Sequence, residues 1–373
     1  MRVTLVSMMT FSHRSYRGFL DEVARRVDSL TVVTGDLATP HAPHAAPREA
    51  DSPYELHLIA PRFARTPATV LFPDLGRLIA DTKPDVVHLI SEPWQLLALQ
   101  GLRAARRSGA PISIQFAENG PRLIGAAGVV RRMVGSAFLR RFDRAVAMTS
   151  QSAAVSRRLA PGVAVAVVPP PSGVGDPSPA HSRRGWFGGS DESRFRIAFV
   201  GRLVAEKGLD DFIRVCNALE REVPIDVAVA GDGPLAPLVV EWAAAKRWRV
   251  HGRLDHMAVL GLLAEADVLV IPSRTVPGLA EQFGRVAVEA MSQGTPVAGY
   301  DCGALREVIG EGGYLVPEGD ERALEAVVRD IALAPERARR DLGERARTRA
   351  QPFADAAIAQ AHVSLWREMC GVP

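Results

Sequence analysis

Short apolar runs alternate with segments of helical length along this chain, and this alternation constrains the fold more than any other feature. In the first half the runs include "RVTLVSMM", "SLTVVTG", "DVVHLIS" and "RAVAMTS". Strands that are apolar on both faces are typical of parallel sheets covered by helices, whereas strands of antiparallel sheets usually alternate apolar and polar residues. The pattern therefore predicts an α/β protein built from βα units.

The alternation is interrupted once and then resumes. Residues 170–194 are rich in Pro, Gly and Ser, and further apolar runs follow, such as "RFRIAFVG", "IDVAVAG" and "DVLVIPS". A chain of 373 residues is long enough for two domains. We predict two facing, doubly wound, Rossmann-like parallel-sheet domains with an interdomain cleft at the carboxyl ends of their strands. The predicted boundaries are 1–175 for the N-terminal domain, 176–194 for a linker, 195–352 for the C-terminal domain and 353–373 for a C-terminal helix.

Composition limits the location and the cofactors that we expect. Hydrophobic residues make up 47% and charged residues 23% of the chain, as in an ordinary soluble protein. No apolar run reaches the ~18 residues that a membrane-spanning helix needs, and "MRVTLVSMM" is too quickly polar for a signal peptide, so we expect a cytoplasmic protein. Cys216, Cys302 and Cys370 are too far apart in sequence to predict a disulfide framework or a zinc site. We expect no cofactor and no bound metal.

The net charge of +3 conceals an asymmetry. Residues 1–175 carry 21 Lys and Arg against 13 Asp and Glu, and the remainder carries 24 against 29. The first half is therefore the better candidate for an anionic partner or surface. Residues 128–144, "GVVRRMVGSAFLRRFDR", predict a basic amphipathic helix that could contact an anionic membrane at its inner face. The alternative is a helix with an arginine-covered outer face. We expect no nucleic acid partner, because no recognition motif accompanies the charge.

One predicted strand–turn–helix segment carries two cations between two glycines. In "FVGRLVAEKGLDDF", Gly201 and Gly208 bracket Arg202 and Lys207. Glycines let a ligand approach the backbone, a helix N-terminus favours negative charge, and two cations can neutralise a diphosphate. The segment predicts a phosphate site; the alternative is a solvated lysine and an ion pair at a strand end.

Two glutamates flank a second predicted helix start. In "LAEQFGRVAVEAM", Glu281 precedes a helix and Glu289 lies two turns inside it, so the residues are at most ~12 Å apart along the axis. We infer that the carboxylates contact two ends of one elongated ligand, with the amides of Gly284, Arg285 and Val286 facing a phosphate between them. The alternative is structural, with Glu281 near a helix cap and Glu289 solvated on the helix.

Six segments, in order, resemble one enzyme family. The segments "GRLVAEKG", "GDGPL", "VHGRLDHMAVLGLLAEADVLVIPS", "EQFGRVAVEAM", "GTPVAGYDCGALREVI" and "GGYLVPEGDERAL" are similar to the C-terminal half of the retaining GT-B glycosyltransferases of family 4, or glycosyl transferases group 1. The resemblance spans residues 196–345 and is only general in the first half of the chain. It implies a GT-B fold whose final helix crosses back to the first domain, and a metal-independent transfer of sugar from a nucleotide sugar.

The resemblance implies a role for each matching residue. Arg202 and Lys207 would hold the donor diphosphate, Glu281 would contact hydroxyls of the donor sugar, and Glu289 would hold the ribose. The catalytic residues would then be Glu281, Arg202 and Lys207. The other donor-binding residues would be Gly18, Gly201, Arg253, Leu254, Phe283, Gly284, Arg285 and Val286, with the loop of Arg253 and Leu254 against the base.

The first half departs from the family pattern. The family commonly has a glycine pair in its first loop and a histidine after a middle strand. This chain has Gly18 alone in "SMMTFSHRSYRGFL", and Glu118 and Asn119 in "QFAENG". We predict that acceptor contacts come from this half, with Glu92, Glu118, Asn119 and His13 as candidates.

The resulting hypothesis is a hexosyltransferase that retains the anomeric configuration. The leaving diphosphate can accept the proton of the acceptor hydroxyl on the same face, so the reaction needs no protein base. From the resemblance, UDP-glucose or UDP-N-acetylglucosamine is the first choice of donor. The acceptor is left open between a small molecule, a glycolipid and a polysaccharide.

Other functions account for less of the sequence. A glycosidase needs two carboxylates ~5–9.5 Å apart around the glycosidic bond, which fits poorly with glutamates beside a cationic phosphate site. A metal-dependent transferase needs clustered carboxylates, and we expect Asp210 and Asp211 to be solvated on a helix. A non-catalytic GT-B module that binds a nucleotide sugar would be favoured by loss of the cations or of Glu281. An epimerase of the same architecture ranks lower, as does a dinucleotide oxidoreductase, since G-x-G-x-x-G is absent after the first strand.

Overall fold

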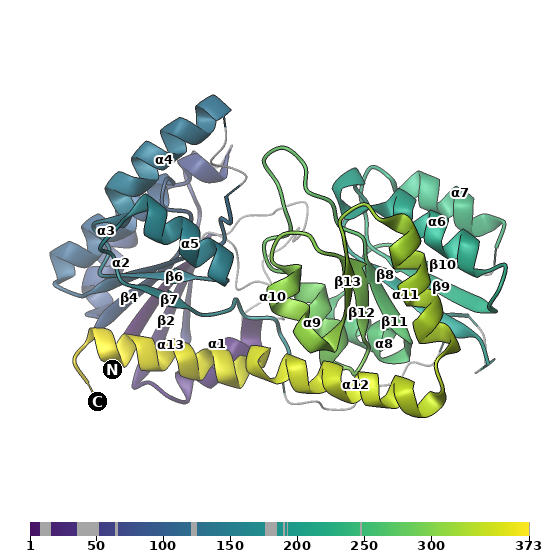
Figure 1. Ribbon diagram of the computed structural model, residues 1–373. Helices are drawn as coiled ribbons and strands as arrows, with labels where there is room; N and C mark the ends of the chain where they lie inside the picture. The colour runs from purple at the N-terminus through teal and green to yellow at the C-terminus, as the bar shows by residue number, and fades with distance from the viewer. Residues whose placement is uncertain are drawn as a thin grey trace. The chain divides into compact units, whose positions relative to one another are not determined.

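The chain folds into two compact units, each with its own parallel sheet and hydrophobic core (Figure 1). Unit 1 comprises Met1–Gly173 and Ala354–Pro373, and unit 2 comprises Val174–Phe353. The structure is a computed structural model, and it describes residues 1–7, 16–35, 52–63, 66–120, 125–175, 185–188, 191, 193–246 and 248–372.

In the described part of unit 1, seven parallel strands form one sheet in the order β3-β2-β1-β4-β5-β6-β7. The strands have no turn of hairpin length between them, because each parallel connection passes through a helix or a long loop. The prediction of a parallel α/β sheet is confirmed. The strands are β1 (Arg2–Ser7), β2 (Ser29–Gly35), β3 (Glu55–Ile59), β4 (Val86–Ile90), β5 (Ile112–Phe116), β6 (Arg144–Ala147) and β7 (Val165–Val167).

Successive residues of each strand point to opposite faces of the sheet, so this sheet has two cores. Leu5 packs in the core that contains α1 and α13, whereas Val6 packs in the core that contains α2, α3 and α5. Both faces are apolar, which is why the strands appear in the sequence as continuous apolar runs. The helices are α1 (Arg17–Ala24), α2 (Leu75–Thr82), α3 (Leu96–Ser108), α4 (Gly125–Leu139), α5 (Ser150–Leu159) and α13 (Asp355–Met369).

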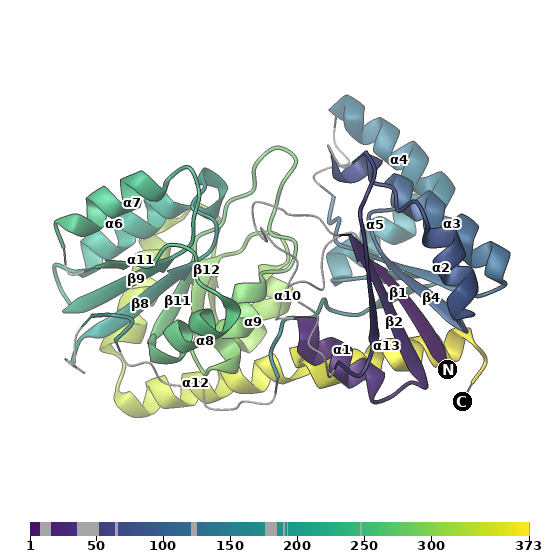
Figure 2. The same cartoon turned by 180° about the vertical axis from the view of Figure 1, so that it is seen from behind.

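The C-terminal helix α13 lies beside α1 on one face of this sheet (Figures 1 and 2). Its inner side chains Ile358, Val363 and Trp366 are at most 1% exposed. A Cβ atom on Gly18 of α1 would lie 2.3 Å from Oδ2 of Asp355, so the absence of a side chain lets the two helices approach. The last helical segment of the sequence therefore completes the core of the first unit.

Two fully buried histidines tie α13 to the sheet. Nδ1 of His362 donates to the carbonyl oxygen of Ile358 at 2.9 Å, and Nδ1 of His88 on β4 lies 2.8 Å from Oγ of Ser113. Oε1 of Gln115 faces Nε2 of both rings, at 3.4 Å from His88 and 3.3 Å from His362. Burial lowers the pKa of His362 to about 4 and holds the pKa of His88 well below its usual range.

This pair predicts that the fold loses stability in mild acid. An unfolded histidine binds a proton near pH 6.5, whereas folded His362 stays neutral to about pH 4. The stability that comes from keeping His362 neutral is complete above pH 6.5 and is lost as the pH falls toward 4. This loss is at most about 3 kcal/mol for His362. In urea unfolding at pH 7 and pH 4.5, His362→Gln should lose clearly less stability than the wild type. His57→Gln, at a half-buried histidine on β3, is the control and should keep the wild-type dependence; equal slopes in all three proteins would refute the prediction.

Unit 2 has a second parallel sheet, with six strands among its described residues in the order β10-β9-β8-β11-β12-β13. One large core, which includes Phe199, Phe212 and Tyr300, covers both faces. The strands are β8 (Phe195–Val200), β9 (Ile225–Ala230), β10 (Arg249–Val250), β11 (Val268–Ile271), β12 (Val297–Tyr300) and β13 (Gly313–Val316). The helices are α6 (Leu209–Leu219), α7 (Ala236–Ala244), α8 (His256–Glu265), α9 (Arg285–Ser292), α10 (Leu305–Ile309), α11 (Glu321–Leu333) and α12 (Glu336–Ala350).

Candidate functional site

The strand order of unit 2 places its ligand-binding position between β8 and β11. The chain runs outward from β8 to β9 and β10, and then returns to the other side of β8 to form β11. At such a reversal the loops after the two central strands separate and leave a crevice at their carboxyl ends. The loop after β8 carries Arg202 and Lys207, and the loop after β11 carries Glu281. The sheet thus brings together segments that are about 75 residues apart in sequence.

Gly208 holds the two loops against each other. Its φ is +67°, and a Cβ atom there would lie 1.9 Å from the carbonyl oxygen of Pro272 at the end of β11. Nearby, the backbone N–H of Arg274 donates to the carbonyl oxygen of Glu206 at 2.8 Å. The turn that carries Lys207, a short 3-10 helix at Ala205–Lys207, is therefore fixed to the loop of Glu281 by backbone contacts.

Gly208→Ala is expected to destabilise the protein by at least about 3 kcal/mol. The left-handed conformation alone costs an L-residue roughly 1–2 kcal/mol, and the new methyl group must also displace the Pro272 carbonyl. Gly201→Ala in the same loop is the matched control, because no heavy atom lies within 4 Å of its Cβ position. Urea unfolding measures both variants. A Gly208→Ala protein within about 0.5 kcal/mol of Gly201→Ala would show that the loops do not need this contact.

Lys207 and Glu281 form an ion pair at this crevice. Nζ of Lys207 lies 2.5 Å from Oε2 of Glu281, and the two side chains are 26% and 14% exposed. Oγ of Ser273 is 3.5 Å from the same carboxylate oxygen. Arg202, on the same loop as Lys207, is paired with Glu206 at 3.0 Å. Each predicted cation of the site therefore has a carboxylate partner within the protein.

The helix start after Glu281 is built by a second glycine. Gly284 caps α9 with φ at +83°, and a Cβ atom there would lie 2.5 Å from Cδ2 of Leu305. The carbonyl oxygen of Glu281 accepts from the N–H of Ala304 at 2.9 Å, which fixes the residue before the turn. No side chain caps α9, and the first N–H groups of a helix have no partner within it. The geometry suits an anion beside Arg285 and Val286.

Glu289 is buried in α9, with 8% of its surface exposed. Its Oε1 lies 3.5 Å from Nδ1 of His256, the first residue of α8, and 3.8 Å from the guanidinium of Arg285. The structural alternative for Glu289, a solvated helix residue, is therefore wrong. A carboxylate held in a buried position next to two donors is poised to accept hydrogen bonds from a ligand.

Asp211 also differs from the sequence-based expectation. Asp210 is exposed, as expected, but Asp211 is only 2% exposed and pairs with both Arg214 and Arg274. The prediction that both are solvated is wrong for Asp211, because Arg274 reaches it from the loop after β11. This contact fixes the first residues of the loop that leads to Glu281.

The other predicted donor residues of unit 2 surround the same strand ends. Phe283 is 5% exposed and its ring packs edge-on against Phe353 at 5.7 Å, so only its backbone can face a ligand. The loop after β10 is joined to the loop after β9 by a 2.7 Å hydrogen bond from Gly231 N–H to the carbonyl oxygen of Gly252. Arg253 is exposed and Leu254 is half-buried in that loop.

Residues 186–349 match the family described as "Glycosyl transferases group 1". We call this matched stretch the group 1 domain. This group 1 domain contains every candidate site residue of unit 2, and its strand-end loops are those described above.

Two curated relatives match parts of the chain. A 2-deoxystreptamine N-acetyl-D-glucosaminyltransferase of Streptomyces fradiae is 34% identical over 282 residues, which are 69% of this chain and 65% of that protein. A glycogen synthase of Mycobacterium tuberculosis is 35% identical over 151 residues, which are 39% of this chain and 35% of that protein. The matches thus span about a third to two thirds of the length of these curated relatives.

Solved structures share the fold along nearly the whole chain. A sucrose-phosphate synthase of Thermosynechococcus elongatus superposes with a TM-score of 0.72 at 21% identity, and covers 99% of each chain. The Anabaena protein HepE, in complex with UDP-glucose, gives a TM-score of 0.71 at 17% identity over 98% of each chain. The protein therefore has the GT-B fold, with the group 1 domain as one of its two Rossmann-like parts.

The predicted residues of unit 1 lie at two places. Glu92 follows β4 and Glu118 follows β5, and the two segments meet where Oε1 of Glu92 accepts from the N–H of Ala117 at 3.3 Å. Glu118 is fully buried and accepts from the N–H of Gly120 at 2.7 Å; Asn119 is half-buried. Gly18 is on α1 against α13, where helix packing explains its lack of a side chain. His13 lies outside the described residues.

The helix predicted over 128–144 is shorter than expected. α4 ends at Leu139, and Arg144 already pairs with Ser113 as the first residue of β6. The outer side of α4 carries Val130 and Met133, which are 60% and 69% exposed, beside the exposed Arg132. Among the described helices, none has both the length and the apolar character to pass through a bilayer.

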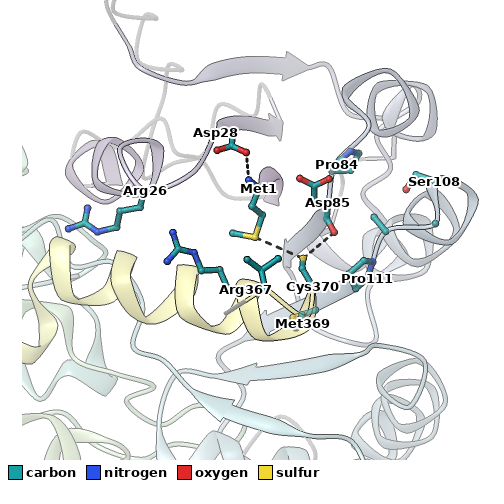
Figure 3. A pocket seen from close by; sticks show the side chains of 13 residues that line it. Met1, Arg26, Asp28, Pro84, Asp85, Ser108, Pro111, Arg367, Met369 and Cys370 are labelled. Atoms are coloured by element: carbon teal, nitrogen blue, oxygen red, sulfur yellow. Dashed lines mark hydrogen bonds and ion pairs between the residues drawn. The ribbon is translucent and has the colours of Figure 1, made fainter.

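A cavity of about 780 Å³ lies at the amino ends of the unit 1 strands, whereas Glu92 and Glu118 lie at their carboxyl ends (Figure 3). Here the thiol of Cys370 donates to the carbonyl oxygen of Asp85 at 3.4 Å, and the amino group of Met1 pairs with Asp28. Burial raises the pKa of the Cys370 thiol. None of the predicted site residues that the structure describes lines this cavity, which agrees with the rule that parallel sheets bind ligands at the carboxyl ends of their strands.

Sequence reasoning missed three contributors to the site: His256, Glu206 and the Asp211–Arg274 pair. Glu206 directly precedes Lys207 in the quoted motif, so its position was visible although its pairing with Arg202 was not. His256 begins α8, and only the packing of α8 against α9 brings it to Glu289.

Proposed function

We propose that the protein is a retaining, metal-independent glycosyltransferase of family 4, which moves a hexosyl group from a nucleotide sugar to an acceptor hydroxyl. The observation that carries the proposal is the Lys207–Glu281 pair at the β8–β11 reversal, beside the start of α9. A cation, a carboxylate and helix N–H groups within one crevice suit a ligand that has both phosphates and hydroxyls.

Each group then has one task. Lys207 and Arg202 bind the diphosphate, and the N–H groups at the start of α9 contribute to the same anion. Glu281 accepts hydrogen bonds from sugar hydroxyls, and Glu289, held by His256, accepts them from the ribose. Arg253 and Leu254 lie against the base. The UDP-glucose of the HepE complex supports a UDP-sugar donor, and the name of the Streptomyces fradiae relative supports N-acetylglucosamine as the sugar.

The chemistry follows from the charges. As the bond between the sugar and the diphosphate breaks, negative charge develops on the leaving oxygen, and Lys207 and Arg202 stabilise it. The diphosphate then takes the proton of the attacking hydroxyl on the same face of the sugar, so the configuration is retained and no protein base is required. No step in this scheme uses a metal ion.

The acceptor contacts are proposed to come from unit 1, with Glu92, Glu118, Asn119 and His13 as the candidates. The named substrates of relatives span different classes. Two relatives act on 2-deoxystreptamine, and a third is named for a phosphatidylinositol dimannoside. The second candidate function, a GT-B module that binds a nucleotide sugar without transferring it, differs only in lacking turnover.

The donor half of the proposal is tested by thermal unfolding in EDTA with UDP-, GDP-, ADP- and dTDP-sugars. A ligand that binds only the folded protein, at 100 times its Kd, adds ~2.7 kcal/mol to stability. We expect the melting temperature to rise with the sugars of one base and not with the matching nucleoside, which lacks the diphosphate. No rise with any nucleotide sugar in folded protein would contradict a preformed donor site.

A further inference from the structure

Several exposed side chains of α4 are apolar, whereas an ordinary surface helix exposes mainly polar residues. Val129, Val130 and Met133 are 44%, 60% and 69% exposed. Ala126 and Ala137 are also exposed, and all five lie at a spacing of three or four residues, so they share one ridge along the helix. We call these five residues the α4 ridge.

Small residues on the opposite side of α4 explain this orientation. Gly128 and Gly135 are buried, and the Cβ position of Gly135 lies 3.4 Å from Cε3 of Trp94. The helix therefore packs on the side of its glycines and of Leu139, and Val129, Val130 and Met133 point outward. In both views the N-terminal end of α4 projects beyond α2, α3 and α5 (Figures 1 and 2).

Along α4 and the three residues that follow it, the charges all have one sign. Residues 125–142 contain Arg131, Arg132, Arg140 and Arg141 and no Asp or Glu. The backbone N–H of Arg140 bonds to the carbonyl oxygen of Ser136, so this exposed arginine continues the last turn of the helix at the end of the ridge. A partner for this face must accept apolar side chains and supply negative charge next to them.

We propose that the α4 ridge docks on an anionic lipid surface. An amphipathic helix lies in the plane of a bilayer with its apolar side in the acyl boundary, while long arginine side chains extend to lipid phosphates. α4 is ~22 Å long, enough for one such contact. Because the ridge is short, binding is weak, reversible and salt-dependent. The inference rests on the surface of unit 1 alone, so it is independent of the transfer reaction.

The test is flotation of the full chain with two kinds of vesicle. One is phosphatidylcholine alone, and the other also contains about 30% phosphatidylglycerol, which gives its surface a negative potential. We expect binding to the anionic vesicles in low salt, loss of binding in high salt, and at least a ten-fold smaller bound fraction for Val130→Glu/Met133→Glu. Arg140→Gln should lower the bound fraction in anionic vesicles only.

Val240→Glu is the matched control. Val240 is also a helical valine, on α7, and is 55% exposed against 60% for Val130. The Val240→Glu protein should bind vesicles like the wild type. The proposal is overturned if the wild type does not float with anionic vesicles, or if Val240→Glu and the ridge variant bind equally. It is also overturned if the wild type does not bind lipid and is a dimer by light scattering, while the ridge variant is a monomer. The ridge would then join two copies of the chain.

Discussion

Lys207→Ala is expected to lower kcat/KM for sugar transfer by about 100- to 1000-fold, because it removes a charge that stabilises the leaving diphosphate. A loss of this size corresponds to about 2.7–4 kcal/mol of transition-state stabilisation. The side chain is 26% exposed and can be truncated without opening a core, so folding should be nearly unaffected. The thermal-unfolding experiment identifies the donor, and steady-state kinetics with that donor measure the loss of kcat/KM.

Lys246 provides a matched control for Lys207. It is 25% exposed and is also paired with a glutamate, Glu220, but it lies between α7 and β10, away from the crevice at the carboxyl ends of the strands. Lys246→Ala should leave kcat/KM within about two-fold of the wild type, a change of less than ~0.5 kcal/mol. Equal losses in both lysine variants, or near-normal turnover of Lys207→Ala, would remove Lys207 from the mechanism.

Glu281→Gln should separate binding from turnover. Without ligand, the Glu281 carboxylate neutralises Lys207, so a diphosphate must compete with it for the cation. The amide of glutamine competes less, and we expect the affinity for the nucleoside diphosphate to rise about three- to ten-fold, or ~0.6–1.4 kcal/mol. Transfer should nevertheless fall at least about 100-fold, because the amide is a poorer acceptor for the sugar hydroxyls.

Titration calorimetry with the nucleoside diphosphate, together with turnover of the nucleotide sugar, measures both halves of this prediction. Glu220→Gln is the control, because it releases Lys246 in the same way but far from the site. Weaker diphosphate binding by Glu281→Gln would mean that the ion pair positions Lys207 rather than competing for it. Undiminished transfer would mean that Glu281 does not contact the sugar.

The strands could be predicted from the sequence because burial on both faces leaves a local signal. Each apolar run that we quoted as a strand forms one, from "RVTLVSMM" at β1 to "DVLVIPS" at β11. The ends of helices were harder to predict from the sequence. The pattern over 128–144 continues past Leu139, but Arg144 joins β6, and the pairing of β6 with β5 is not a local property.

The sequence could predict which residues form the candidate donor site, but not which of them contact one another. The glycines, cations and glutamates of the group 1 domain are visible in two short motifs. That Lys207 touches Glu281, 74 residues later, follows only from the adjacency of β8 and β11. The burial of Asp211 has the same origin, since Arg274 comes from the loop after β11. Gly135 packs on Trp94 and so turns the apolar ridge of α4 outward, and a helical pattern alone does not show which side is buried.

The most direct test of the central claim is ¹H NMR of a reaction in EDTA that contains the bound nucleotide sugar and 2-deoxystreptamine, the acceptor named for two relatives, alongside glycolipid and oligosaccharide acceptors. The account predicts a glycosylated product from one acceptor, with the anomeric configuration of the donor, and no product with Lys207→Ala. An inverted product would contradict retention. Tight donor binding without transfer to any acceptor would contradict the enzyme and favour the non-catalytic module.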